Sequence, residues 1–211
     1  MSSTSQGTVV EHVVLVKVKD DTEPTKVNAM VNAMNSLATI DGVKHLTVGP
    51  LLRNGPTTTT SGLRFTHMLH NRYNSKEALE VYNKHPSHVN AGFLFPVCDD
   101  LMVVDWVAGG VNLPPLAKGS ALRVSFLKLK ESIYEEVKDE ALSVVRGMEH
   151  GVAGVLWQFS YDENFSPERA KGFTLASLAV FPEREELQSV ELDEGLGVVV
   201  EDVVVVDYVV P

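Results

Sequence analysis

Two segments of the chain are apolar at both odd and even positions and end in two alternating lysines. They are His12–Lys19 and Arg123–Lys130. A run that is apolar on both parities is typical of a β-strand covered on both faces. Three further pairs of similar segments follow in the same order in each half, namely Gly42–Val48 with Gly151–Trp157, Phe65–Thr66 with Phe173–Thr174, and Val103–Val107 with Val205–Val209. The pattern predicts two divergent copies of one unit in a single chain.

Each copy also contains residues with helical spacing, which predicts an amphipathic helix lying on a sheet. The apolar positions are Val27, Met30, Val31, Met34 and Leu37 in the first copy, and Val137, Ala141, Val144, Val145 and Met148 in the second. Pro24 suits a first helical turn, and Gly42 and Gly147 suit helix exits. A second helix is expected from Asn74 or Ser75 up to Pro86, with Asn74 and Glu77 resembling a capping box, and a shorter one over Pro182–Val190.

The two copies therefore read as strand, helix, strand, strand, helix, strand. We predict domains at residues 8–108 and 119–210, joined by a linker rich in Gly and Pro near residue 115. Such a unit forms a four-stranded antiparallel sheet with both helices on one face. Because the strands are apolar on both faces, the sheet face without helices must also be buried. We expect the two sheets to pack against each other through these faces. The predicted fold class is α+β, with two ferredoxin-like β-α-β-β-α-β repeats whose antiparallel sheets pack as an α+β barrel around a modest cavity.

Composition narrows the functional classes. The 211 residues are 44% hydrophobic and 22% charged, which is typical of a folded globular chain. With 18 Lys and Arg against 28 Asp and Glu, the formal charge is -10, and no basic cluster offers a platform for a nucleic-acid backbone. The N-terminal residues lack the pattern of a signal peptide, and no stretch is long and apolar enough for a membrane span. We expect a cytoplasmic protein that binds neither nucleic acid nor membrane.

Three segments carry a resemblance to a known family. Glu11–Lys19, Tyr82–Val89 and Val103–Trp106 resemble the stress-responsive A/B-barrel (Dabb) domain of the dimeric α+β barrel superfamily, which is common in plants. The resemblance covers residues 8 to 108 well and residues 119 to 210 weakly. In this family two such units usually pair from separate chains, so a tandem copy implies an internal pseudo-dimer, and a homodimer of the whole chain is a further expectation. The resemblance also implies a role in stress response or pathogen defence.

The family contains both proteins without a settled reaction and a polyketide cyclase, which closes its product by an intramolecular aldol condensation. The resemblance implies His88 as the base and Tyr82 as its partner, with His12 and His85 as other pocket histidines. An imidazole and a phenol suit this chemistry, because ring closure needs a base and a donor for the developing oxyanion.

A structural role explains the same residues. His85 and His88 flank Pro86 at a helix exit, where an imidazole can bond the last carbonyls of the helix, and Tyr82 has the spacing of a core residue. The second copy has Arg123 in place of His12 and Val190 in place of Tyr82, so at most one site is expected per chain. We predict a non-catalytic stress protein. The alternatives are a cyclase or lyase and a carrier of a small apolar ligand, and a pocket of about 300 Å³ or more on which His88 and Tyr82 converge would favour either of them.

Metal binding is a separate expectation. The resemblance implies a magnesium ion on the backbone oxygens of Leu37, Ile40 and Val43, where the first helix ends. A zinc site at His85 and His88 is disfavoured because no Cys, Asp or Glu stands near them. His67 and His70 lie at odd spacing in a strand and therefore on opposite faces, so they cannot pair as ligands. We assign no role to either of them.

Overall fold

The structure is a computed structural model that describes residues 8–52, 62–89, 96–108, 113–131, 134–151, 156–190 and 200–211. The first repeat consists of β1 (Val9–Val18), α1 (Pro24–Ser36), the 3-10 helix η1 (Leu37–Thr39), β2 (Val43–Pro50), β3 (His67–Tyr73), α2 (Lys76–Lys84), α3 (Pro86–Val89) and β4 (Cys98–Ala108). The second consists of β5 (Ala121–Leu129), α4 (Tyr134–Gly151), β6 (Gln158–Glu163), the 3-10 helix η3 (Pro167–Arg169), β7 (Leu175–Phe181), α5 (Arg184–Ser189) and β8 (Val200–Val209).

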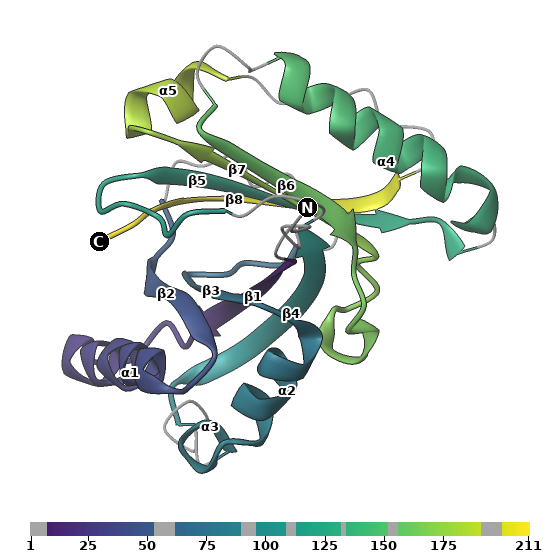
Figure 1. Cartoon of the computed structure of the whole chain (residues 1–211). Helices are drawn as coiled ribbons and strands as arrows, with labels where there is room; N and C mark the ends of the chain where they lie inside the picture. Colours follow the sequence, from purple (N-terminus) through teal and green to yellow (C-terminus); the bar gives the residue numbers. More distant parts are fainter. Residues whose placement is uncertain are drawn as a thin grey trace, which may run out of the picture.

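The two sheets have the same antiparallel topology. Their strand orders are β2-β3-β1-β4 and β6-β7-β5-β8, so the first strand of each repeat lies in the middle, beside the last strand. In Figure 1 the sheets face each other, with α1, α2 and α3 on the outer side of one and α4 and α5 on the outer side of the other. The molecule therefore has four layers in the order helix, sheet, sheet, helix. This arrangement confirms the predicted fold of two packed ferredoxin-like repeats.

The two edge strands of one sheet meet the two edge strands of the other, which closes the barrel. On one side the backbone N–H of Phe165, just after β6, donates to the carbonyl of Asp105 in β4 at 2.9 Å. On the other side the N–H of Leu52, just after β2, donates to the carbonyl of Asp207 in β8 at 2.8 Å. Closure matters because a free sheet edge would expose unpaired backbone groups.

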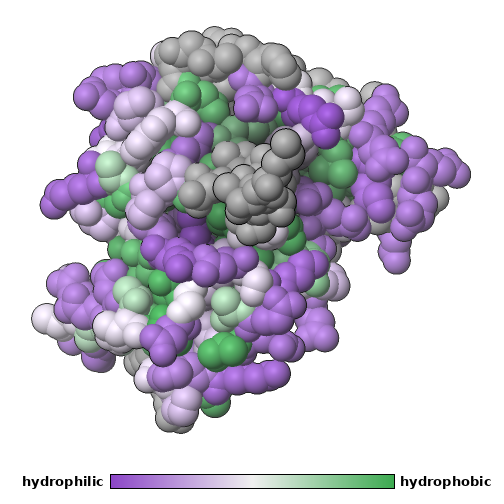
Figure 2. All heavy atoms as spheres, viewed as in Figure 1, coloured by the Kyte–Doolittle hydropathy of each residue, from purple (hydrophilic) through white to green (hydrophobic). Residues whose placement is uncertain are grey.

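The main core lies between the sheets and is built by both repeats. Its buried side chains include Val13, Leu15, Met68 and Trp106 from the first repeat and Val124, Phe126, Leu178 and Val206 from the second. Smaller clusters lie between each sheet and its own helices, where Met30 and Met34 of α1 and Ala141 and Val145 of α4 are buried. On the face seen in Figure 2, hydrophilic residues cover most of the outer helix surface. The strands are thus apolar on both faces because one face meets the other sheet and the other face meets helices.

Local boundaries differ from the sequence expectations in four places. Ser75 caps α2, accepting a hydrogen bond from the Ala78 N–H at 3.2 Å, so Asn74 is not the cap. Pro86 begins the short helix α3 and does more than end α2. Gly147 lies inside α4, which continues to Gly151, so it is not a helix exit. The strand expected over Gly151–Trp157 begins at Gln158, and residues 152–155 of that segment lie outside the described ranges, as do linker residues 109–112.

Among the residues that the structure describes, no helix combines the length and the apolar character that a membrane crossing requires.

Candidate functional site

His12 reaches the helix side of the first sheet because β1 alternates. Val13 and Leu15 point into the barrel, and His12 and Val14 point toward the helices. The register pairs His12 with Asp105 of β4, and the His12 Nδ1 lies 2.5 Å from the Asp105 carboxylate, with both side chains buried. An ionised carboxylate accepts from the Nδ1–H, which leaves His12 Nε2 as the ring nitrogen available to the pocket that His12 lines.

Tyr82 and His88 come from α2 and α3 above the same sheet. Tyr82 is buried on the inner face of α2, and its ring centroid lies 6.0 Å from that of His12. Because α2 ends at Lys84 and Pro86 starts α3, the chain turns back and brings His88 over Tyr82, at 4.6 Å between ring centroids. The His88 Nδ1 lies 3.1 Å from the backbone carbonyl of Asn83. A carbonyl can only accept, so this contact places a proton on Nδ1 and leaves Nε2 as an acceptor.

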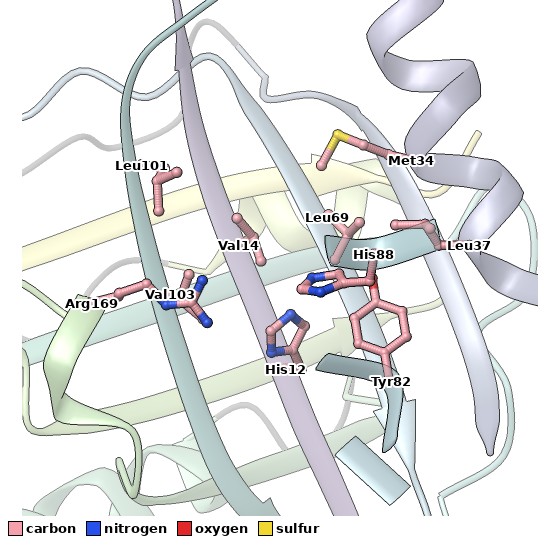
Figure 3. Close-up of a pocket in the computed structure, with 10 residues that line it drawn as sticks. All are labelled: His12, Val14, Met34, Leu37, Leu69, Tyr82, His88, Leu101, Val103 and Arg169. Atoms are coloured by element: carbon pink, nitrogen blue, oxygen red, sulfur yellow. The ribbon is translucent and has the colours of Figure 1, made fainter. Parts of the chain in front are cut away.

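These three residues line one pocket with a volume of about 70 Å³. Figure 3 shows His12, Tyr82 and His88 grouped together, with Arg169 approaching from the other side, next to Val103. Arg169 belongs to η3 of the second repeat, so both repeats contribute to the pocket. The remaining lining residues are apolar: Val14, Met34, Leu37, Leu69, Leu101 and Val103.

The protonation states follow from burial and from neighbouring charges. Burial raises the pKa of Tyr82 to about 12, so its hydroxyl is a proton donor at neutral pH. Burial lowers the pKa of His88, which keeps its imidazole neutral. Burial alone would raise the pKa of Asp105, but the contact with His12 lowers it, so this carboxyl is ionised. The pocket therefore offers a neutral imidazole, and its ring packs against that of Tyr82, whose hydroxyl forms hydrogen bonds with Asn71 and Tyr73. An imidazole and a phenol are groups suited to moving a proton.

Of the four histidine and tyrosine candidates, the structure brings together His12, Tyr82 and His88 and leaves out His85. His85 follows α2 as its C-terminal cap residue and does not line the pocket. Its Nδ1 accepts a hydrogen bond from the Ser87 backbone N–H at 3.2 Å, whereas the expected contact of an imidazole with a carbonyl of the last helical turn is made by His88 to Asn83. Sequence reasoning assigned no role to Asp105. The signal was present, because an acidic residue interrupts the apolar closing strand in both repeats, at Asp105 and Asp207.

The second repeat has no equivalent pocket chemistry among its described residues. Arg123 stands opposite Asp207 as His12 stands opposite Asp105, and its guanidinium donates to both Asp207 oxygens at 2.8 and 2.9 Å. The same guanidinium donates to the Val190 carbonyl at 2.7 Å. The Arg123 guanidinium is therefore engaged in structural hydrogen bonds.

The counterpart of Tyr82 differs from the one expected. The N–H of His85 bonds the Tyr82 carbonyl, and the N–H of Val190 bonds the Leu187 carbonyl in the same way. Leu187 is thus the residue in place of Tyr82, and Val190 corresponds to His85. The expectation for Val190 was wrong because it counted residues along the sequence, whereas the helix cap fixes the register.

The magnesium expectation rests on three neutral oxygens where α1 and η1 end. The Leu37 carbonyl accepts from the Ile40 N–H at 3.1 Å, and the Ile40 carbonyl accepts from the Val43 N–H at 3.2 Å. Each of these two oxygens keeps one further lone pair. Magnesium sites usually include one or two carboxylates, and the described part of the chain holds no cluster of three or more His, Cys, Asp or Glu suited to a metal. The magnesium site at Leu37, Ile40 and Val43 stays a prediction.

A second polar cluster, inside the barrel, was missed by the sequence reasoning. His70 and Arg72 of β3 point inward, where both contact the fully buried Glu11 of β1, with the His70 Nε2 at 2.6 Å from its carboxylate. Burial would raise the pKa of Glu11, but His70 and Arg72 lower it to about 2. Arg72 also donates to Gln158 of the second repeat at 2.8 Å. The sequence pattern hides this cluster because Glu11 meets His70 and Arg72 only when β1 and β3 pair in this register.

Comparisons with known proteins agree with this architecture. The sequence profile of the family described as Stress responsive A/B Barrel Domain matches residues 10–108. One stress-response A/B barrel domain-containing protein of Arabidopsis thaliana is 40% identical over 100% of this chain and 82% of its own length. A second Arabidopsis thaliana protein of the same description is 38% identical over 97% of this chain and 98% of its own length. The crystal structure of an anthrone oxidase-like protein superposes with a TM-score of 0.65 over 97% of this chain and 92% of that chain, at 11% identity, which speaks for the fold alone.

Proposed function

Because the chain belongs to the stress-response A/B barrel family, we propose that it acts in a stress response by binding a small, largely apolar molecule in the pocket of its first repeat, without converting it. The observation that carries this proposal is the lining, in which six of the ten residues are apolar and three of the four polar ones, His12, Tyr82 and His88, lie together. His12 and His88 each direct one ring nitrogen to a fixed protein partner, so both side chains are held in place before any ligand arrives.

The volume limits the size of the ligand. Pockets for drug-sized molecules measure about 300 to 1,000 Å³, and the pocket here, at about 70 Å³, does not reach the size that we expected of a carrier or a cyclase. Only a much smaller ligand fits it. A single water needs roughly 10 to 15 Å³ by this measure, so the space holds about five water-sized groups. The volume favours a branched group of four or five carbon atoms over an extended polyketide. For a ligand of about seven non-hydrogen atoms, a dissociation constant near 1 mM is a reasonable expectation.

The test uses 3-methylbutanamide as a neutral probe, titrated into the full chain and followed by ¹⁵N chemical shifts. We expect saturable binding near 1 mM that Leu101→Trp abolishes, because the larger ring fills the half-buried rim of the pocket. Leu101→Met is the matched control, since it keeps the volume nearly constant and should bind as the parent chain does. Equal binding by the Leu101→Trp variant, or no saturation at tens of millimolar, would overturn the proposal.

One observation favours a second candidate function, acid–base catalysis on a small carbonyl compound. The contact of the His88 Nδ1 with the Asn83 carbonyl leaves Nε2 as an acceptor, and the His88 and Tyr82 rings lie 4.6 Å apart between centroids. In such a step the C–H bond next to a carbonyl breaks, its proton passes to His88 Nε2, and the electron pair forms the enolate. The Tyr82 hydroxyl donates a hydrogen bond to the developing oxyanion. The enolate could then attack a second carbonyl, as in an aldol condensation.

Deuterium exchange separates the two candidates. The probe is 4-methyl-2-pentanone in D₂O, with incorporation next to its carbonyl followed by proton NMR. Catalysis predicts exchange faster than in buffer alone, and loss of that exchange in His88→Ala while the affinity for 3-methylbutanamide is kept. Exchange at the buffer rate in the parent chain would leave the binding role and reject the catalytic one.

A further inference from the structure

The segment Asn164–Lys171 of the second repeat is fixed along β4 of the first repeat. Asn164 accepts a hydrogen bond from the Asp105 backbone N–H at 3.0 Å, and the next residue, Phe165, donates its own N–H to the Asp105 carbonyl at 2.9 Å. At the other end of the segment, Lys171 forms an ion pair with Asp100 at 2.7 Å. Between these contacts Ala170 is fully buried in the core between the sheets. The segment is therefore anchored on both sides of its 3-10 turn.

Arg169 is held between these two anchors and lies at the rim of the pocket. It lines the pocket next to Val103, and its side chain is exposed, so this is the side on which the pocket reaches the surface. Within the described residues no hydrogen bond or ion pair engages the guanidinium. The charge of Arg169 acts on a residue of the pocket. Burial has the largest effect on the pKa of His88, and the charge of Arg169 contributes to lowering it further. The rim thus carries a cation on an anchored backbone segment, and the hydrogen-bond donors of its side chain are open to a ligand.

Six apolar side chains line the pocket, His12, Tyr82 and His88 lie together on one side of it, and the exposed Arg169 lies across from them. Guanidinium pairs with carboxylate through two parallel hydrogen bonds, which fixes orientation as well as charge. We propose that the ligand of this pocket is a small amphiphilic carboxylate, whose branched apolar body fills the cavity and whose carboxylate pairs with Arg169 at the rim. This proposal rests on the binding function proposed above and names its ligand class.

The second repeat then has a role although its own site is blocked by Arg123. It supplies the anion-binding side chain across the barrel, on a segment that the first repeat itself anchors. In a dimer of identical single-domain chains, the arginine would have to come from the partner chain. In a tandem chain, one repeat can supply the histidines and tyrosine of the pocket and the other repeat can supply the arginine.

The test compares two probes of the same shape on the full chain. 3-Methylbutanoate is ionised at neutral pH, and 3-methylbutanamide is its uncharged counterpart. A charge-assisted pair at an exposed rim should make the carboxylate bind about tenfold more tightly than the amide at low salt. Arg169→Gln should remove this advantage, so that the two probes bind with about equal affinity, and Arg169→Lys should keep part of it because the charge remains. Arg184→Gln, which removes an exposed arginine from α5, is the matched control and should keep the full advantage.

The outcomes separate the two proposals. If both probes bind with equal affinity, or if the advantage of the carboxylate survives in Arg169→Gln, the carboxylate proposal is overturned while the binding function stands. If neither probe binds the parent chain, both proposals fall together. Because Arg169 is exposed and forms no hydrogen bond in the described structure, its replacement should leave the unfolding transition unchanged, and a thermal melt of each variant checks this.

Discussion

His45 should make the stability of the barrel depend on pH between pH 8 and pH 5. It lies in β2 with its ring centroid 5.6 Å from that of His70, inside the barrel. Its Nε2 is buried without a hydrogen-bond partner among the described residues. Burial lowers the pKa of His45 to about 3, with further lowering by the neighbouring His70 and Arg72 and an opposing effect of Glu11. The folded chain therefore keeps His45 neutral across the physiological range.

The sign and size of the effect follow from proton binding. In the unfolded chain a histidine takes up a proton near pH 6.5, whereas folded His45 takes one up only near pH 3. The unfolded state thus binds more protons as the pH falls below 6.5, and stability falls with it. Between pH 8 and pH 5 the contribution of His45 is about 2 kcal/mol lost from the free energy of unfolding. Glu11 adds little in this range, because its carboxyl is ionised in both states above about pH 5.

The perturbation is His45→Gln, and the assay is urea unfolding of parent and variant at pH 8, 7, 6 and 5. The other histidines with lowered pKa values, His67, His70 and His88, remain in both chains, so their contribution cancels in the comparison. At pH 8 the difference between the chains reports the loss of packing alone. We expect the parent to lose about 2 kcal/mol more than the variant between pH 8 and pH 5. Parallel pH dependences would refute the burial of a neutral His45.

Three further substitutions test the packing between and within the repeats, each by urea unfolding at pH 7. Glu11→Gln should cost about 3 to 5 kcal/mol, because it breaks a fully buried pair and leaves the Arg72 charge uncompensated, and a cost under about 1 kcal/mol would contradict the network. Thr47→Val removes the 2.7 Å hydrogen bond to the Tyr208 hydroxyl across the repeats and should cost about 1 to 3 kcal/mol, so a neutral result would argue against this closure of the barrel. Gly147→Ala should stabilise the chain by about 0.5 to 1 kcal/mol, since an added Cβ meets nothing within 4 Å inside α4, and a loss of stability would argue that α4 ends earlier.

The sequence was informative wherever the two repeats share a local pattern. The matched segments around His12 and Arg123 are the central strands of the two sheets, and Asp105 and Asp207 stand opposite these two residues. The matched segments Phe65–Thr66 and Phe173–Thr174 also have equivalent places in the two sheets. Thr66 and Thr174 each donate their backbone N–H to the central strand of their own sheet at 2.9 Å. These features depend on contacts within one repeat. The same contacts occur in the other repeat, so the pattern of each repeat supports the prediction made from the other.

Several features that the sequence did not reveal depend on contacts between residues far apart in the chain. Arg169 reaches the pocket from η3 because its segment is anchored on β4, and nothing in the local sequence of η3 indicates this. His70 appeared ordinary from its spacing, yet it contacts Glu11 in the barrel interior, where the second repeat supplies Gln158 and Ser160. The errors at Gly147 and Val190 are local, since α4 continues past Gly147 to Gly151 and the cap of α5 at Val190 sets a different register from the one expected.

The association of whole chains into a homodimer stays a prediction, whereas the pairing of the two repeats within one chain is a property of the fold. Arg123 shows why the repeats are not functionally equivalent. Its bidentate contact with Asp207 takes the place of the His12 imidazole and offers no acceptor nitrogen on the helix side of the second sheet.

The most direct measurement is a ¹⁵N chemical-shift map of the full chain titrated with 3-methylbutanoate. We expect saturable chemical-shift changes at Val14, Leu69, Val103 and Arg169, and no changes at the residues around Arg123. Changes centred on the second repeat, or spread without saturation over the whole surface, would contradict a single pocket assembled by both repeats.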